Sequence, residues 1–182
     1  MKIVFLSDSF PPENQGGAGE MVFRIAHRMI KEGHEAWVVT TTRNRAMSGL
    51  AHEGGLTVFR IFSDYSPRWR AWLSLFNPSV VKQAVHFIKT IAPDVVHAHN
   101  IHSYLSYAIL SRARALAPRV FLTAHDVMSF AYTKFWPSGQ TSEIPSYYMG
   151  FFKNLRIAKK RFNPFRNIVI RHYLKACTRI FA

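Results

Sequence analysis

The chain has 182 residues, of which 48% are hydrophobic and 19% charged. This composition suits one folded domain and excludes a disordered or low-complexity chain. With 24 Lys and Arg against 10 Asp and Glu, the formal net charge is +14, so we expect an anionic partner such as nucleic acid, a membrane surface or a phosphorylated ligand. The single cysteine, Cys177, excludes an internal disulfide and favours a reducing, cytoplasmic compartment. No apolar run approaches the roughly 20 residues that a membrane span requires.

The first elements of the chain alternate between strand and helix. Residues 2–6 form a short apolar run, which predicts a buried strand that ends in a loop. Residues 18–32 place apolar side chains on one helical face and are followed by Gly33, a residue typical of helix ends. Residues 36–42 are strongly β-prone. These segments together predict a strand–helix–strand unit.

The same alternation continues along the chain. It predicts further strands and helices in the order strand 56–61, helix 78–91, strand 94–99, helix 103–117 and strand 119–123. This order is typical of a Rossmann-like α/β fold with a doubly wound parallel sheet. After Asp126 the periodicity fades to about residue 146, which predicts a long loop. A basic, aromatic helical stretch and a last strand at residues 178–182 follow.

The loop after the first strand contains glycines directly before a helix. In an open parallel sheet, ligands bind beyond the carboxyl ends of the strands. Gly16 and Gly17 would let the backbone approach a ligand there, and the helix N-terminus favours phosphate. The loop has no dinucleotide fingerprint and no P-loop motif. The alternative is a flexible loop whose glycines serve only to turn the chain.

Histidines cluster at the end of the strand predicted at residues 94–99. His97 and His99 share one side of that strand and could bind zinc, but His102 is the only further ligand nearby, which argues against a metal site. Polar recognition of a ligand by His99 or Asn100 is favoured. The alternative is that these histidines are structural and hydrogen-bonded at a strand end.

A second polar pair follows the strand predicted at residues 119–123. His125 would lie at the mouth of the cleft, where an imidazole can donate or accept a proton near neutral pH. Asp126 could orient a ring or hold a loop. The alternative is a buried histidine with all its hydrogen bonds made. The chain has no G-x-S-x-G motif, so a hydrolase triad lacks its nucleophile elbow.

These segments together resemble the N-terminal domain of family 4 (group 1) glycosyltransferases, which have the two-lobed GT-B fold. The likeness covers about residues 1–130. It rests on four segments in order and spacing: Lys2-Ile3-Val4-Phe5-Leu6-Ser7-Asp8-Ser9-Phe10-Pro11-Pro12 with Gly16-Gly17-Ala18, a helix ending at Gly33-His34-Glu35, Pro93-Asp94-Val95-Val96-His97-Ala98-His99, and Thr123-Ala124-His125-Asp126.

The resemblance implies a role for each matching residue. Gly16 and Gly17 approach the donor diphosphate, His125 lies against the donor sugar as the catalytic residue, and His99 and Asn100 border the acceptor pocket. Asp126 belongs to the same substrate-binding set. The implied reaction is retaining transfer from a nucleotide sugar to a sugar or lipid-linked acceptor, in cell-envelope, polysaccharide or glycolipid synthesis. It implies no metal and no other cofactor, because helix dipoles and basic side chains stabilise the leaving diphosphate.

The chain departs from the family in one respect. The donor nucleotide of the family is held mainly by a C-terminal lobe with an E-x7-E motif, whereas the last carboxylate here is Glu143. We therefore expect residues 1–182 to form a single acceptor-side domain without its donor-binding lobe, and to be inactive alone. Two alternatives stay open: another GT-B enzyme such as a sugar-nucleotide epimerase, and a non-catalytic α/β binding module with a basic face.

The positive charge is concentrated near the C-terminus. Residues 144–182 contain nine Lys or Arg and no Asp or Glu. Residues 151–162 and 68–76 mix cations with aromatic side chains, which suits an anionic membrane surface. We expect peripheral contact with the inner face of the cytoplasmic membrane. The alternative is a solvated basic face with its aromatics packed in the core or against the second lobe. No nucleic-acid-binding module is present, which argues against nucleic acid.

Overall fold

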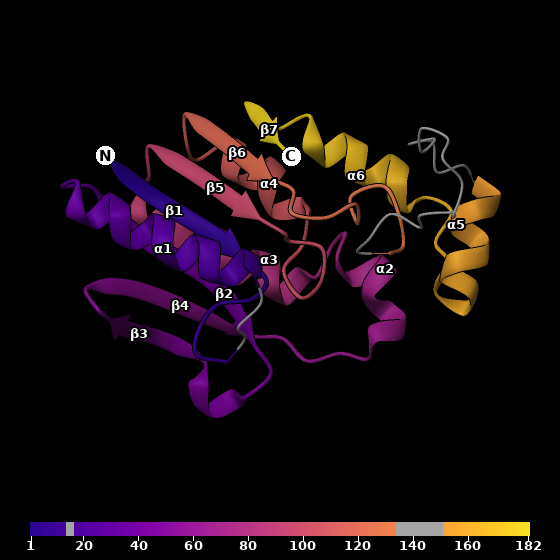
Figure 1. Ribbon diagram of the computed structural model, residues 1–182, viewed down its shortest axis with the longest axis horizontal. Helices are drawn as coiled ribbons and strands as arrows, with labels where there is room; N and C mark the ends of the chain where they lie inside the picture. The colour runs from indigo at the N-terminus through magenta and orange to yellow at the C-terminus, as the bar shows by residue number, and fades with distance from the viewer. Residues whose placement is uncertain (14–16, 134–150) are drawn as a thin grey trace, which may run out of the picture.

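The computed structural model describes residues 1–13, 17–133 and 151–182 (Figure 1). The strands are β1 (Lys2–Ser7), β2 (Glu35–Thr42), β3 (Gly49–Glu53), β4 (Leu56–Phe62), β5 (Val95–His99), β6 (Arg119–Thr123) and β7 (Arg179–Phe181). They form one sheet in the order β3-β4-β2-β1-β5-β6-β7. Every neighbouring pair is parallel except β3 and β4. The Rossmann-like α/β prediction is confirmed.

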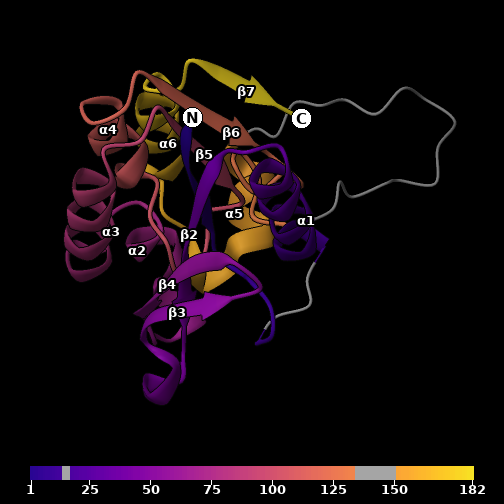
Figure 2. The ribbon, with the colours of Figure 1, turned by 90° about the vertical axis from the view of Figure 1, so that its left-hand side faces the viewer.

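Helices cover both faces of the sheet. One face carries α1 (Gly17–Lys31), and the other carries α3 (Pro78–Ile91), α4 (Ala108–Arg114) and α6 (Arg166–Leu174), as Figure 2 shows. Shorter helices lie beyond the strand ends: α2 (Arg70–Leu73), α5 (Phe151–Ala158) and the 3-10 helices η1 (Arg45–Met47), η2 (Pro67–Trp69) and η3 (Lys159–Arg161).

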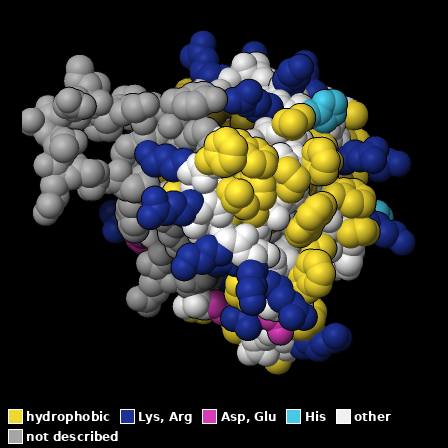
Figure 3. All heavy atoms as spheres, turned by 90° about the vertical axis from the view of Figure 1, so that its right-hand side faces the viewer, with side chains coloured by type: hydrophobic (Ala, Val, Ile, Leu, Met, Phe, Trp, Pro, Cys, Tyr) yellow, Lys and Arg dark blue, Asp and Glu magenta, His cyan; other side chains and the backbone are white. Residues whose placement is uncertain are grey.

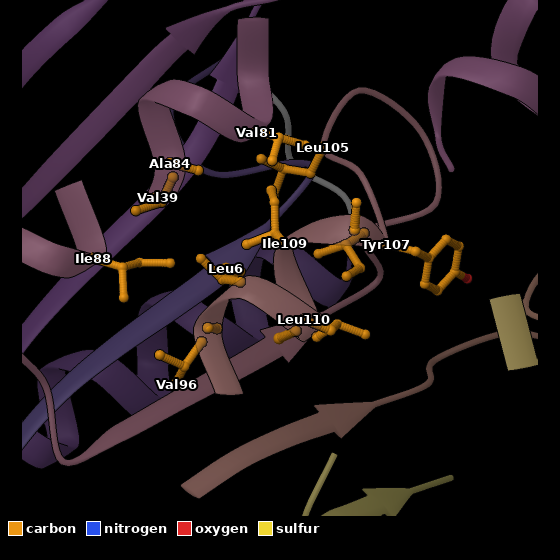
Figure 4. Close-up of a cluster of buried hydrophobic side chains, with 14 of the residues drawn as sticks. Leu6, Val39, Val81, Ala84, Ile88, Val96, Leu105, Tyr107, Ile109 and Leu110 are labelled. Carbon is orange, nitrogen blue, oxygen red and sulfur yellow. The ribbon is translucent and has the colours of Figure 1, made fainter. Parts of the chain in front are cut away.

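The central strand β1 is buried on both faces. Ile3 and Phe5 belong to the hydrophobic cluster under α1. Val4 and Leu6 point to the opposite face and belong to the larger cluster with α3 and α4 (Figure 4). Burial of these apolar side chains is the main favourable contribution to folding. It also fixes the position of the loops that leave the carboxyl ends of the strands.

Two elements differ from the sequence-based prediction. The sheet is not wholly parallel, because β3 pairs with β4 as an antiparallel edge strand. Gly54 and Gly55 connect them with φ values of 56° and 82°, as a two-residue hairpin turn requires. The helix predicted at residues 103–117 begins only at Ala108.

Other predicted elements lie close to their expected positions. The helix at Pro78–Ile91 has the predicted bounds; the Asn77 side chain caps it, and Ala92 ends it in a left-handed conformation. The strand predicted at residues 178–182 is β7, which lies parallel to β6. The short helices η2 and α2 were not predicted. Most of the loop predicted after Asp126 lies outside the described residues.

Candidate functional site

The strand order reverses next to β1. From β1 the chain builds β2 and β4 on one side, then returns to build β5, β6 and β7 on the other. Ligands of open α/β sheets bind beyond the carboxyl ends of the strands at such a reversal. The carboxyl ends of β1, β5 and β6 and the N-terminus of α1 lie at this one edge (Figure 1).

Two predicted site histidines are in direct contact there. His99 ends β5 and His125 lies two residues after β6. Nδ1 of His99 is 2.9 Å from Nε2 of His125, and the rings are stacked with centroids 5.2 Å apart. His99 is only 1% exposed, whereas His125 is exposed to solvent. A buried ring therefore positions an exposed one.

This hydrogen bond couples the tautomers of the two rings. In a neutral imidazole one ring nitrogen donates and the other accepts. If Nε2 of His125 accepts from His99, Nδ1 carries the proton and donates to a ligand; if Nε2 donates, Nδ1 accepts. The tautomer of the buried ring thus sets what His125 offers at this edge of the sheet.

Both strand histidines are held in the neutral form. Burial lowers the pKa of His99 to about 3, and the nearby His97 and His125 add to that shift. Burial likewise lowers the pKa of His97 to about 4. His97 Nε2 lies 2.9 Å from the Thr123 hydroxyl, so this histidine ties β5 to β6. Among the described residues, Nε2 of His99 has no hydrogen-bond partner.

Asn100 and Asp126 join the loops after β5 and β6. Asn100 has a left-handed backbone, with φ at 45°, which Asn tolerates better than most residues. Its Oδ1 accepts the backbone N–H of His125 at 3.0 Å, and its Nδ2 donates to Asp126 at 3.2 Å. Asp126 also accepts the N–H of Met128 at 2.9 Å. In this geometry the two side chains hold the loop that carries His125.

Asp8 is a site residue that the sequence analysis did not single out. Its carboxylate accepts the backbone N–H groups of Ser103, Tyr104 and Leu105 at 2.6–2.9 Å. These bonds replace the first turn of the predicted helix, which explains why α4 begins late. Burial raises the pKa of Asp8 to about 7, although the three hydrogen bonds and Arg70 act in the opposite direction. Only its place after a buried strand could have marked it.

The glycine loop is described in part. Gly16 lies outside the described residues. Gly17 is the first residue of α1, and a Cβ there would meet nothing within 4 Å, so the space beside this helix N-terminus is open. Gly19 is the glycine that packing requires, since a Cβ would lie 2.6 Å from the carbonyl oxygen of Ser9.

The described residues contain neither a metal-binding cluster nor a membrane-spanning helix. No group of three His, Cys, Asp or Glu side chains in residues 1–13, 17–133 and 151–182 is placed to hold a metal ion. No helix in the same residues is both long and apolar enough to span a membrane.

Residues 15–182 match the family model of Glycosyltransferase Family 4. The chain belongs to this family. It is 27% identical over 135 residues to a phosphatidylinositol N-acetylglucosaminyltransferase subunit of Arabidopsis thaliana, a match that covers 72% of this chain and 29% of the relative. It is 25% identical over 138 residues to an uncharacterized 42.6 kDa protein in the cps region of Klebsiella pneumoniae, with 69% and 37% coverage. The matches thus span about a third of each relative.

The chain is also similar to solved structures at low identity. An α,α-trehalose-phosphate synthase (UDP-forming) from Burkholderia vietnamiensis aligns with a TM-score of 0.48 and 10% identity, covering 99% of this chain and 39% of that one. An α-glucosyltransferase in complex with UDP and DNA aligns with a TM-score of 0.41 and 13% identity, covering 87% and 36%.

Proposed function

We propose that this chain is the acceptor-side lobe of a retaining glycosyltransferase that moves a sugar from a nucleotide donor to an acceptor. The observation that supports it best is the exposed His125, held by His99, at the edge where α1 begins. Family membership supports the reaction class. The retaining course, the donor and the acceptor are parts of the proposal.

The geometry suggests how each part would act. The open N-terminus of α1 at Gly17 offers backbone N–H groups and partial positive charge to the leaving diphosphate. His125 presents one ring nitrogen to a sugar hydroxyl, in a role set by its bond to His99. Asn100 and Asp126 fix the backbone around it. Such preorganisation is worth several kcal/mol in a transition state. We propose that no metal takes part, because the helix N-terminus and basic side chains would stabilise the leaving diphosphate.

A mutation of His125 tests the proposal. Transfer from UDP-glucose, UDP-N-acetylglucosamine and GDP-mannose is measured with the complete gene product. We expect His125→Asn to reduce the transfer rate roughly 100-fold or more, without loss of folded structure, because the ring is exposed. His86→Asn, on the exposed side of α3, is the matched control. A His125→Asn enzyme as active as the His86→Asn control would refute the assignment.

The lobe assignment makes its own prediction. We propose that a second lobe holds most of the donor nucleotide, so the 182-residue chain alone catalyses no transfer. Measurable transfer by this purified chain would show that the assignment is wrong.

A membrane-facing role is the second part of the proposal. Large apolar side chains are exposed on η2, α2, α5 and α6 and just before α6: Trp69, Trp72, Phe151, Phe152, Leu155, Phe165 and Ile168. Figure 3 shows hydrophobic side chains gathered on this side of the molecule, with Lys and Arg beside them. Cations next to aromatic side chains favour an anionic lipid surface.

Vesicle sedimentation tests the membrane contact. We expect more binding to anionic than to neutral vesicles, and less binding after Phe152→Ser, since Phe152 is 81% exposed. Leu50→Ser is the control, because Leu50 is exposed on β3 away from this side. Equal binding to both vesicle types, or to neither, would argue for a surface covered by protein instead.

A further inference from the structure

Residues of α2, η3 and the start of α6 line a hollow. Figure 1 shows α2 and α6 beyond the carboxyl ends of the strands. The hollow opens to solvent, and its enclosed part has room for about one water-sized group, such as a single oxygen of a larger ligand. The polar side chains in its wall are those of Arg70, Ser74, His102, Tyr132, Arg161 and Arg166. Among the described residues, its lining therefore includes three guanidinium groups and no carboxylate.

Hydrogen bonds hold this wall together. The side-chain amide of Asn163 donates to the carbonyl of Ala71 at 2.8 Å, which ties the segment after η3 to α2. The Tyr132 hydroxyl donates to the Asn163 carbonyl at 3.0 Å and accepts the Asn163 N–H at 2.9 Å. The chain segments that carry the arginines are thus fixed relative to one another by the protein itself.

Arg166 is a buried cation whose direct contacts are all with neutral groups, and the Asp126 carboxylate acts on it only through its charge. It is 3% exposed. Its guanidinium donates to the carbonyl of Met128 and, at 2.9 Å, to Oδ1 of Asn167, and lies over the Tyr132 ring. Burial lowers the pKa of Arg166 below its ordinary value. A charge in this position costs free energy unless an anion approaches it.

Arg70 and Arg161 have no carboxylate in direct contact. Within the described chain neither guanidinium forms an ion pair, and Arg70 interacts with Asp8 only through its charge. Two carboxylates lie nearby but are occupied. Asp8 accepts three backbone N–H groups, and Asp126 is bound by Asn100 and Met128 and lies 3.5 Å from His102.

The Ser74 hydroxyl is a second observation, independent of the arginines, that indicates a ligand. Its side chain is 1% exposed and lines the hollow, and its hydroxyl has no hydrogen-bond partner in the part of the chain that the structure describes. A buried hydroxyl without a partner is unfavourable. An oxygen-rich anion in the hollow would satisfy it.

We infer that this hollow binds a phosphoryl group of the acceptor substrate, held by Arg70, Arg161 and Arg166 with the Ser74 hydroxyl. Guanidinium groups match the oxygens of a phosphoryl group, and several donors around one dianion bind it tightly. His102 lines both this hollow and a smaller one with Asn100 and Asp126, so an acceptor anchored at the arginines extends toward the edge that carries His125. The inference rests on the proposed function in that it assigns the phosphoryl group to the acceptor.

The phosphoryl group can belong to a soluble sugar phosphate or to a lipid headgroup. Two probes distinguish these sources. The first is inorganic phosphate, titrated by calorimetry at constant ionic strength. The second is sedimentation with phosphatidylcholine vesicles that do or do not contain phosphatidic acid, whose headgroup is a phosphate monoester.

Neighbouring cations provide the matched variants. Arg161→Gln removes a charge that lines the hollow, and Lys160→Gln removes a charge beside it that does not. Both side chains are exposed, so neither change is expected to unfold the protein, and circular dichroism verifies this. Ser74→Ala is the second variant, since it removes a hydroxyl without changing the charge.

We expect Arg161→Gln to weaken phosphate binding roughly tenfold, Ser74→Ala to weaken it less, and Lys160→Gln to leave it nearly unchanged. The same ranking on phosphatidic acid vesicles, with weak binding of inorganic phosphate, would indicate a lipid headgroup. Equal losses for Arg161→Gln and Lys160→Gln in both arms, or no binding in either arm, would overturn the inference.

These probes are independent of catalysis. If phosphate binds as expected but the complete gene product transfers no sugar, the hollow stands and the proposed function fails. If sugar transfer is found but both binding arms are negative, the proposed function stands and the phosphoryl site does not.

Discussion

Arg60 and Arg166 are both buried, but only one of the two regions that hold them places a carboxylate in contact with the guanidinium. Arg60, on β4, donates twice to the Glu53 carboxylate, at 2.8 and 3.0 Å, and once to the Pro11 carbonyl at 2.7 Å. The direct contacts of Arg166 are all with neutral groups. The first region pairs its cation with a carboxylate, whereas the second holds its cation without a carboxylate in contact. Buried charge that is paired serves structure, and buried charge that is unpaired points to a ligand.

Removal of each guanidinium should show the largest difference in stability between the two regions. We expect Arg60→Met to lower the free energy of unfolding by about 2–3 kcal/mol, because it removes a buried guanidinium from Glu53, whose side chain is 36% exposed and partly compensated by water. Arg166→Met should cost about 1 kcal/mol or less, because no carboxylate loses a partner. Urea unfolding of the two variants measures both values. Equal losses would mean that Arg166 is compensated within the fold.

Asp8 tests whether a nearby carboxylate is free to neutralise the arginines. We expect Asp8→Ala to cost about 3 kcal/mol in unfolding free energy, since the N–H groups of Ser103–Leu105 would lose their acceptor. Asp64→Ala is the control, because its carboxylate pairs with Arg43 at an exposed site, where such pairs contribute little. A small effect of Asp8→Ala would contradict this structural role. The Asp8 carboxylate would then be free to neutralise the arginines of the hollow.

The pH dependence of stability extends the comparison to the histidines. His97 and His99 have lowered pKa values in the folded protein, so each destabilises it as the pH falls below about 6.5. Asp8 has a raised pKa, so its contribution rises as the pH falls from about 7. The two histidines together outweigh Asp8, so we expect the free energy of unfolding to fall by about 1 kcal/mol between pH 7 and pH 5.

A variant isolates the histidine part of this balance. In the His99→Asn variant only His97 and Asp8 remain, and their contributions change in opposite directions with pH. The unfolding free energy should therefore become nearly independent of pH in the same range. Equilibrium unfolding at several pH values measures the slopes. A wild-type protein that gains stability on acidification would show that the strand histidines are not held neutral.

The smallest expected effect concerns the exposed pairs of α1. Glu20 and Arg24 form an i,i+4 pair at 2.7 Å. We expect Glu20→Gln to cost about 0.4 kcal/mol at low salt and less at high salt. Thermal unfolding at two salt concentrations measures this difference. A larger loss that does not depend on salt would mean that exposed ion pairs contribute more to the stability of this fold than we expect.

The sheet and most helices could be predicted from local patterns. Apolar runs such as residues 2–6 and the helical spacing of residues 78–91 depend on neighbours in sequence, and both elements formed as expected. The late start of α4 could not be predicted in this way, because it depends on Asp8, 95 residues from Ser103. The hairpin of β3 was missed although Gly54 and Gly55 signal its turn.

The candidate site was predictable in part. The positions of His99, Asn100, His125 and Asp126 after parallel strands predicted that they would lie at one edge, and they do. The division of labour among them depends on individual hydrogen bonds and was not predictable. The hollow was not predictable either, since Arg70 and Ser74 of the α2 segment and Arg166 of α6 are distant in sequence and share no motif.

The attachment of the loop after β5 to Asp8 has a consequence for that edge of the sheet. Three backbone N–H groups of this loop donate to one carboxylate, whose pKa is raised to about 7. Because this pKa is raised where the acid is buried, proton uptake favours the buried arrangement, so mild acidification would hold that loop more firmly against the strands beneath it. The loop also carries His102, whose position would then be better defined at lower pH.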